Sequence, residues 1–348
     1  MRKTLERLAV LLLCAAAIGT GCAKTVSEGT NVAAKRYLDA WMQVNHPSAK
    51  ASAHGIFVLE DIPGTGEELF DSSYVFAQYT YRTLDGEIVS YTNDSTAKQM
   101  NEYDPTYYYG SEVLELYQGG ASQGILDLLL GGNGLAAMKV GGSRTAVIPG
   151  WLSSTSYYYD SEKEYQDNVT GTNYILDIKV TDCCDNIIKY QVDKIEDYLA
   201  NVRKTTTDST GYGFYYRKTG GKGEPYDTIT FPTDTSIYIN YIGRLLSGRV
   251  FDTNIKDTAK VWGLYDEDND YEPVVINWGE ELDDITMTDD DTSVITGFAK
   301  TLWQMHPYEK GYGVFTSYYG YGYSGSGNSI PGYAPLIFEI EIVDEPED

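Results

Sequence analysis

Basic residues, histidine and cysteine are all scarce in this chain of 348 residues, and each shortage excludes a class of function. Lys and Arg total 26 against 51 Asp and Glu, which gives a formal net charge of −25. Because phosphate binding needs a basic surface, this balance argues against nucleic acid as a partner and is typical of a soluble, self-repelling protein. The three histidines, His46, His54 and His306, are too scattered for a zinc site, so we expect no metal and no cofactor.

Cysteine occurs at four positions, two of them near the N-terminus. Cys14 and Cys22 lie there, and the other two, Cys183 and Cys184, are adjacent. Neighbouring Cα atoms are about 3.8 Å apart, below the usual span of a disulfide, so a bridge between them would be strained. We predict two free thiols at the end of a strand, with a redox pair as the alternative.

Long apolar runs are missing after Cys22, so any membrane attachment falls to the N-terminus. A basic start at residues 2–7 precedes the apolar run Leu8–Ile18, as in a secretory signal peptide. The small residues that follow end at Cys22 and resemble a bacterial lipoprotein lipobox, although Gly19 stands where Leu is usual. The resemblance implies that residues 1–22 are a signal peptide and that Cys22 is acylated. The exported protein would then be anchored to a membrane and face the periplasm or the cell surface; ordinary secretory cleavage is the alternative.

Tyrosine is abundant, with 32 residues, many in runs with Gly, Ser and Thr that favour β structure. The chain after the signal reads as two copies of one plan, each a helix, a strand, a Gly-rich turn and a sheet wrapped on a second helix. One constant offset in residue number relates Tyr79 to Tyr241, Gly86 to Gly248 and Leu176 to Phe338. We therefore infer an internal duplication.

The elements expected in the two copies point to an α+β fold with a mostly antiparallel sheet. In the first copy we predict a helix over 33–44 and strands over 55–59, 75–79 and 175–180. In the second copy we predict a helix over 187–202 and strands over 213–216, 237–241 and 336–343. The expected domains are residues 23–184 and 211–348, with a linker helix over 185–210.

An ordered set of short phrases in the second copy carries a family resemblance. They are Tyr241-Ile242-Gly243-Arg244-Leu245, Phe251-Asp252, Val294-Ile295-Thr296-Gly297-Phe298, Tyr321-Gly322, Ile330-Pro331 and Leu336-Ile337-Phe338-Glu339. Over about 213–343 this order resembles the FKBP family of peptidyl-prolyl cis/trans isomerases, with Phe298 in place of the usual pocket-floor Trp. The resemblance implies two FKBP-like domains, each an antiparallel sheet curled around a short helix and each preceded by an N-terminal helix.

The resemblance also implies roles for individual residues. Tyr241, Asp252, Phe298 and Tyr321 would be catalytic, and the substrate-binding residues would be Phe251, Val274, Ile276, Val294, Ile295, Ile330 and Phe338. Phe298 would form the floor under the proline ring, the Ile295 N–H and the Tyr321 hydroxyl would bond substrate carbonyls, and Asp252 would stabilise a developing dipole without proton transfer. The alternatives are a plain aromatic core and a loop-capping Asp252. A long acidic insertion, 253–293, separates two of the phrases.

The first copy has lost this set, because Val89-Ser90 stand where Phe251-Asp252 do and Ile125 where Phe298 does. Its Gly120–Gly124 fits the G-x-S-x-G elbow of hydrolases, but the only histidine downstream is His306 in the other domain. In the second copy, Asp266, Asp268 and Asp270 imitate the start of a calcium loop that lacks its Gly and its Glu. The internal repeat explains Gly124 without catalysis, and we favour a solvated acidic loop over a calcium site.

Together these features predict a prolyl isomerase active in the second domain. Its partners would be unfolded or partly folded proteins that display X-Pro bonds outside the cytoplasm. The rival interpretation is a non-enzymatic FKBP-like binding or chaperone lipoprotein.

Overall fold

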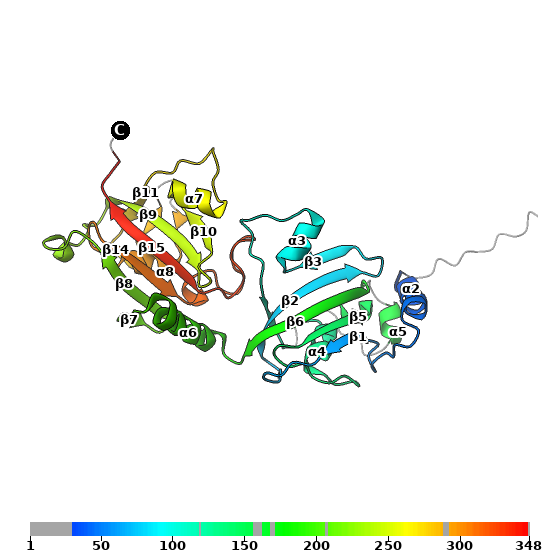
Figure 1. Cartoon of the computed structure of the whole chain (residues 1–348). Helices are drawn as coiled ribbons and strands as arrows, with labels where there is room; N and C mark the ends of the chain where they lie inside the picture. The colour runs from blue at the N-terminus through cyan, green and yellow to red at the C-terminus, as the bar shows by residue number, and fades with distance from the viewer. Residues whose placement is uncertain are drawn as a thin grey trace, which may run out of the picture.

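A computed structural model describes residues 30–117, 120–155, 162–167, 171–205, 208–287 and 292–346. The chain forms two α+β units that lie side by side, each with an antiparallel sheet curled around a helix (Figure 1). We call the one that ends with strand β6 (Tyr174–Cys184) the N-terminal unit and the one that begins with helix α6 (Ile187–Asp197) the C-terminal unit. The signal segment and Cys22 lie outside the described residues. Within the described ranges, no helix is both long and apolar enough to cross a membrane.

The N-terminal unit begins with helix α2, whose buried Leu38 and Met42 pack against the outer edge of its sheet. The sheet order is β1-β5-β6-β2-β3, with β4 paired to the other end of β2. Helix α4 fills the curled face, and its Leu128 and Leu129 are fully buried. The bounds are α2 Thr30–Asn45, β1 Phe57–Ile62, β2 Tyr74–Thr83, β3 Ile88–Tyr91, α3 Asp94–Met100, β4 Glu112–Glu115, α4 Gln123–Leu130, β5 Ser143–Ile148, η1 Gly150–Leu152 and α5 Glu162–Asp167.

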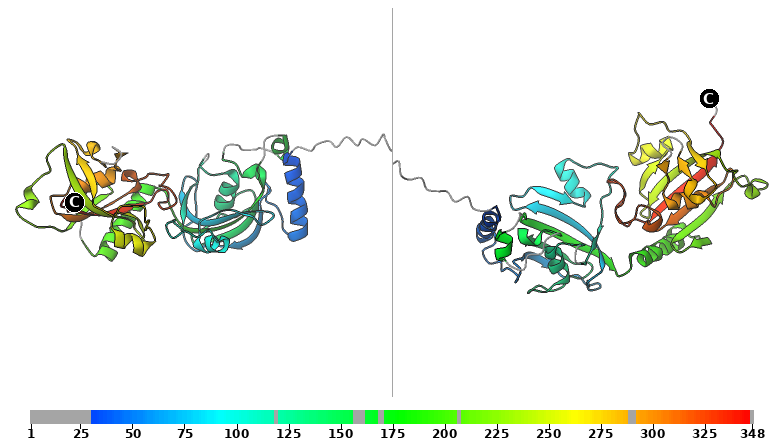
Figure 2. Two further views of the ribbon diagram at one scale, coloured as in Figure 1. Left: turned by 90° about the horizontal axis from the view of Figure 1, so that it is seen from above. Right: turned by 180° about the vertical axis from the view of Figure 1, so that it is seen from behind.

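The C-terminal unit repeats this arrangement after α6, which continues as a π-helical turn, η2 (Tyr198–Arg203). Its sheet order is β13-β12-β11-β9-β15-β14-β8-β7, with β10 paired to β9, and helix α8 fills the curled face (Figure 2). The bounds are β7 Asp208–Gly211, β8 Phe214–Gly220, η3 Tyr226–Thr228, β9 Thr235–Leu245, β10 Val250–Thr253, α7 Lys256–Trp262, β11 Val274–Trp278, η4 Leu282–Asp284, β12 Thr286–Met287, β13 Thr292–Ser293, α8 Thr296–Leu302, β14 Lys310–Phe315, η5 Ser317–Tyr319 and β15 Leu336–Val343.

Strand register bears out the duplication. Tyr79 pairs with Ile178 in the first sheet, and Tyr241 pairs with Ile340 in the second, so both members of the pair are displaced by the same offset in residue number. The same displacement relates the pair Tyr81–Ser90 to the pair Gly243–Asp252. Because a slip of one residue would turn every side chain to the other face, equal register means that equivalent positions face equivalent surroundings. The α+β fold with two antiparallel sheets, each curled around a helix, is therefore confirmed.

Several expected bounds differ from those observed. The helix expected over 33–44 runs from Thr30 to Asn45, and the one expected over 187–202 is α-helical only to Asp197. The strand expected over 55–59 begins at Phe57. The insertion 253–293 does not lie outside the sheet, because its strand β11 pairs with β9 along its whole length. The domain limits of 23–184, 185–210 and 211–348 stay predictions.

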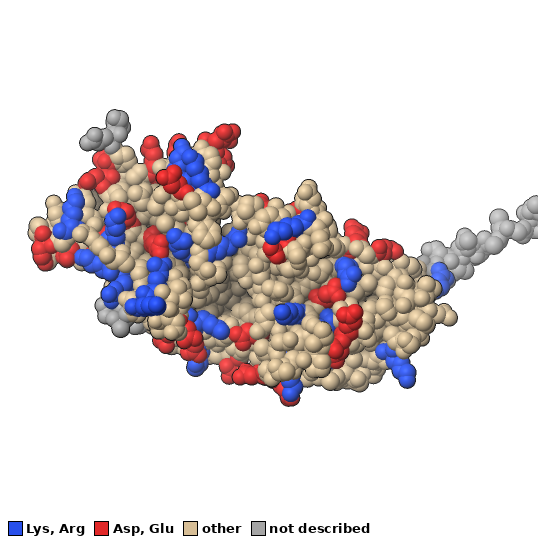
Figure 3. Space-filling model, viewed as in Figure 1, with Lys and Arg blue, Asp and Glu red and all other residues tan. Residues whose placement is uncertain are grey.

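Acidic and basic side chains are interspersed over the C-terminal unit on the face shown in Figure 3. Glu339 of β15 pairs with Arg203 and Arg244, and Lys310 pairs with Glu341 across two strands. Pairs of this kind near the surface contribute at most about 1 kcal/mol each. These basic residues are thus matched by acids rather than gathered into a basic patch.

Candidate functional site

The inner face of β9 carries the residues on which the site is built. Burial alternates along the strand, so Tyr241, Gly243 and Leu245 face the core. Gly243 makes room for aromatic rings, because a Cβ there would lie 2.5 Å from the Phe251 ring and 3.2 Å from the Phe338 ring. The pairing of β10 to β9 shifts register between Val250 and Asp252, and such a bulge redirects side chains locally.

Four side chains pack into an aromatic cluster that we call the aromatic box: Tyr241, Phe251, Phe298 and Phe338. Phe298, on α8, is 2% exposed and meets Phe338 edge to face with ring centroids 5.0 Å apart. Tyr241 also stands edge to face on Phe298 at 5.9 Å, and Phe251 on Phe338 at 5.6 Å. Edge-to-face pairs contribute about 0.5–1.5 kcal/mol each beyond the area they bury, so the box is a rigid apolar wall.

A single carboxylate lies at the edge of this wall. The Tyr241 hydroxyl donates a hydrogen bond of 2.7 Å to Asp252 Oδ2. Burial raises the pKa of Asp252, while the hydrogen bond from Tyr241 acts in the opposite direction. Burial and then the nearby Asp252 charge raise the pKa of Tyr241, so the phenol keeps its proton and acts as a donor. Asp252 itself is exposed, so a hydrogen-bond acceptor lies at the surface beside the buried rings.

The other residues implicated by the sequence surround the same cluster. Tyr321 is half-buried and packs against the same hydrophobic cluster, and its pKa is raised first by burial and then by the charge of Asp252. Ile330 is 4% exposed and belongs to the buried core, whereas Val294 and Ile295 are half-buried and pack against it. Within β11, Val274 is half-buried and Ile276 fully buried, so Val274 is the better placed of the two to meet a ligand.

Three residues that support the site were not among the site residues predicted from the sequence. Phe315 of β14 stacks behind Phe338 with centroids 6.0 Å apart. Asn254, buried after β10, accepts the Tyr241 N–H through Oδ1 at 2.8 Å and donates through Nδ2 to the carbonyls of Ile239 and Glu272. Tyr108 comes from the N-terminal unit and packs against the same hydrophobic cluster. Phe315 ends a strand in which every residue after Lys310 is buried, and its apolar neighbour Val314 could have indicated it, but no local pattern indicates a contact between units.

The equivalent surface of the N-terminal unit is built differently. Ser90 stands at the register position of Asp252, and Val89, at the position of Phe251, is 53% exposed where Phe251 is 8% exposed. Ile125 and Leu176 occupy the core instead of two rings. The Tyr79 hydroxyl donates to Glu112 of β4 at 2.5 Å. This unit therefore retains the scaffold without the aromatic box.

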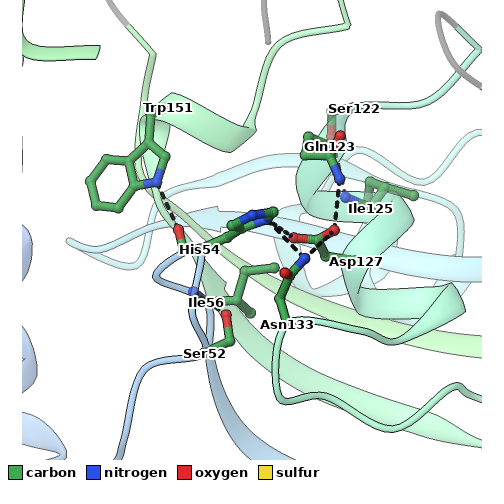
Figure 4. A network of polar contacts seen from close by, with 9 residues as sticks. All are labelled: Ser52, His54, Ile56, Ser122, Gln123, Ile125, Asp127, Asn133 and Trp151. Carbon is green, nitrogen blue, oxygen red and sulfur yellow. Dashed lines mark hydrogen bonds and ion pairs between the residues drawn. The ribbon is translucent and has the colours of Figure 1, made fainter. Parts of the chain in front are cut away.

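Figure 4 shows the surroundings of the G-x-S-x-G segment. Ser122 is the N-cap of α4 and accepts the Ile125 N–H, set apart from the imidazole of His54. His54 Nδ1 instead lies 2.6 Å from Asp127 Oδ2, and Gln123 Nε2 donates to the other carboxylate oxygen at 2.7 Å. A Cβ at Gly124 would come within 2.6 Å of Ile148 Cγ2, so this glycine is required for packing. The segment caps and packs a helix, and His54 and Asp127 tie a loop to it.

Metal and thiol chemistry find no support in the described part of the chain. No group of three His, Cys, Asp or Glu there could hold a metal ion. Cys183 and Cys184 are free, and burial raises the pKa of Cys184 to about 12. Because a thiolate is the reactive form, these thiols are poor nucleophiles at neutral pH.

A family model described as FKBP-type peptidyl-prolyl cis-trans isomerase matches residues 229–343. The matched segment contains the whole aromatic box, together with Asp252 and Tyr321. No curated protein matches the chain.

Solved structures of similar proteins have low TM-scores. The three FKBP domains of wheat FKBP73 are 15% identical, with 84% of this chain and 95% of that one covered and a TM-score of 0.28. FkpA from Escherichia coli is 25% identical, with 45% and 58% covered and a TM-score of 0.30. A peptidyl-prolyl cis-trans isomerase from Pseudomonas syringae pv. tomato is 22% identical, with 46% and 97% covered and a TM-score of 0.30. The assignment of residues 229–343 therefore rests on the family match.

Proposed function

We propose that this chain, which carries an FKBP-type peptidyl-prolyl cis-trans isomerase domain at residues 229–343, isomerises X-Pro bonds at the aromatic box of its C-terminal unit. The observation that carries the proposal is the edge-to-face packing of Tyr241 and Phe338 on Phe298, with the Tyr241–Asp252 hydrogen bond beside it. The function is rotation about a peptide bond, and it needs no nucleophile and no metal.

The geometry favours the transition state of that rotation. Uncatalysed X-Pro rotation crosses about 18–20 kcal/mol because the planar imide is conjugated. The twisted imide has lost this conjugation and is less well solvated, so an apolar wall binds it better than either planar isomer, and such differential binding lowers the barrier. Phe298 and Phe338 would hold the proline ring. Asp252, beside these rings, would face the carbonyl group whose dipole changes as the X-Pro bond rotates.

The N-terminal unit favours a second candidate, a binding or chaperone module. It has the same fold and register without the aromatic box, so it presents a scaffold that lacks the catalytic surface. Between the units lie cavities of about 540 and 380 Å³, the larger lined partly by Phe76, Tyr198 and Tyr333. A chain that acted only by binding would prevent aggregation equally well after the aromatic box is altered.

The test compares both activities in one set of variants. We expect Phe298→Leu to lower isomerisation of an X-Pro peptide in a protease-free assay while leaving suppression of aggregation unchanged. An unaltered isomerisation rate, with the fold intact by circular dichroism, would remove the C-terminal site from the function.

We further propose that the protein is exported, anchored through an acylated Cys22, and acts on folding proteins outside the cytoplasm. The apolar run Leu8–Ile18, followed by small residues that end at Cys22, supports this. An acyl anchor followed by a polar tether would hold the acidic units away from an anionic membrane surface. Mass spectrometry of the mature N-terminus tests the anchor: an unmodified N-terminus beyond Cys22 in membrane-extracted protein would contradict it.

A further inference from the structure

A tyrosine-rich segment of the N-terminal unit, residues 103–110, reaches the C-terminal unit beside the aromatic box. It follows α3 and lies next to the loop between β14 and β15 in both Figures 1 and 2. The Tyr108 N–H donates to the Asn328 carbonyl at 2.6 Å, and Arg249 Nη2 donates to the Pro105 carbonyl at 2.5 Å. Pro105 also faces the end of α7, because a Cβ at Gly263 would lie 3.2 Å from its ring. Three elements of the C-terminal unit are thus contacted.

The ring of Tyr108 packs against the C-terminal unit, although the residue belongs to the N-terminal unit. It is half-buried against the hydrophobic cluster that includes Phe251 and Ile330, and burial raises the pKa of its hydroxyl. The hydroxyl donates at 3.0 Å to the Ser111 carbonyl, within the N-terminal unit. The ring therefore supplies apolar contact across the boundary, while the hydroxyl only orients it.

The contacted loop carries two residues of the proposed site. Tyr321 lies at its beginning and Ile330 near its end, and Asn328 lies between them. Tyr333, farther along the loop, donates to Glu115 of the N-terminal unit and packs edge to face on Tyr74 with centroids 5.5 Å apart. The attachments at Asn328 and Tyr333 therefore bracket Ile330 and Pro331.

This loop is expected to be costly to order, so contacts that hold it in place would favour substrate binding. Gly325 and Gly327 both adopt positive φ, 67° and 50°, and the exposed Asn328 follows them. Fixing one residue's backbone costs about 1–2 kcal/mol of conformational entropy, and glycine loses the most freedom on ordering. If the N-terminal unit holds the loop in place before substrate arrives, less of this cost falls on binding.

We propose that the N-terminal unit is a positioning element for the isomerase site, in which Tyr108 braces the loop that carries Tyr321 and Ile330. The inference rests on the proposed isomerase function. It gives the unit without an aromatic box a role in substrate binding through the other unit's loop, rather than a site of its own.

Tyr108→Ala in the full chain tests the bracing. We expect the KM for an X-Pro peptide to rise about three- to tenfold with little change in kcat, because the half-buried ring's apolar contact is lost while the backbone hydrogen bond to Asn328 remains. Amide hydrogen exchange should quicken over residues 322–332. Arg249→Ala, which leaves the N-terminal unit unaltered, should produce the same two changes more weakly. Tyr108→Phe should behave as the parent, because it retains the ring.

Tyr107→Ala is the matched control, since this neighbour is 38% exposed. Equal KM values in Tyr108→Ala and the parent, or an equal rise in Tyr107→Ala, would overturn the proposal. Amide hydrogen-exchange rates distinguish a failure of the bracing proposal from a failure of the proposed isomerase function. A parent without isomerase activity would sink the function, whereas unchanged exchange over 322–332 in Tyr108→Ala would sink the bracing alone.

Discussion

The two units share a framework and differ at the few positions where chemistry would take place. Six strands follow the same order and pairing in both units, and the C-terminal sheet adds β7, β12 and β13. Both units also place a glycine in the filling helix where a side chain would collide. Gly124 faces Ile148 in one unit, and Gly297 faces the Phe315 ring in the other. The framework is thus set by backbone pairing and by one close helix-to-sheet approach, and neither requires an aromatic surface.

The difference lies in what fills the curled sheet. Ile125 and Leu176 in the N-terminal unit stand where Phe298 and Phe338 stand in the C-terminal unit, and the exposed Ser90 stands where Asp252 does. Aliphatic side chains pack as well as rings and bury comparable area, so the fold tolerates the exchange. The exchange removes the flat faces and the carboxylate. Substituting both units at equivalent positions therefore separates what the fold needs from what the reaction needs.

The largest effect is expected from the floor of the box. Phe298→Leu should lower kcat/KM for an X-Pro peptide by about 10- to 100-fold, or about 1.4–2.8 kcal/mol of transition-state stabilisation. Leucine retains most of the volume, so the C-terminal unit should stay folded. Ile125→Val at the equivalent position is the control and should leave kcat/KM unchanged. If both variants lower the rate equally, the two units share the activity and the comparison fails.

Asp252→Asn should reduce kcat/KM by about tenfold, as expected for one removed charge-assisted interaction. Because burial raises the pKa of Asp252, the parent's rate should fall as acid protonates this carboxyl at a pH above that for an ordinary Asp. The Asn variant should lack that limb of the profile. A raised folded-state pKa also means that the carboxyl costs stability once the pH exceeds it, so Asn should be the more stable at pH 7. Ser90→Ala, the matched control, should alter neither curve.

A stability comparison follows from the residues that hold β9 and β2 at the site. Asn254 accepts the Tyr241 N–H, and Thr92, its equivalent in the first unit by the same offset, accepts the Tyr79 N–H at 2.9 Å. Asn254→Ala leaves buried backbone groups unpaired and should cost about 2–4 kcal/mol, against about 1 kcal/mol for Thr92→Ala. Urea unfolding of each variant measures both. Equal losses would show that Asn254 does no more than its counterpart.

Much of this framework was predictable from the sequence, because periodic burial and regular spacing both leave a pattern in it. The closing strand Leu336–Val343 has the predicted bounds, and the constant offset between the two copies anticipates the register. The residues of the aromatic box could be predicted from the sequence because their order along the chain resembles that of a known family. The contacts of Tyr108 and Asn254 could not be predicted. Packing between units leaves no periodic pattern in the sequence, and neither does a side chain that bonds three separate backbone groups.

The smallest expected effect concerns how each filling helix begins. Ser122 caps α4 by accepting the Ile125 N–H, whereas the N-cap residue of α8 is Ile295, whose side chain makes no capping hydrogen bond. Ser122→Ala should therefore cost the N-terminal unit about 1 kcal/mol. Ile295→Ser would gain a cap of similar worth but lose half-buried apolar surface, so the net stability should change by less than about 1 kcal/mol. Its kcat/KM should nevertheless fall, because Ile295 borders the box. A stable Ile295→Ser variant with full activity would mean that Ile295 occupies the N-cap of α8 because it packs against the core, and not because it binds substrate.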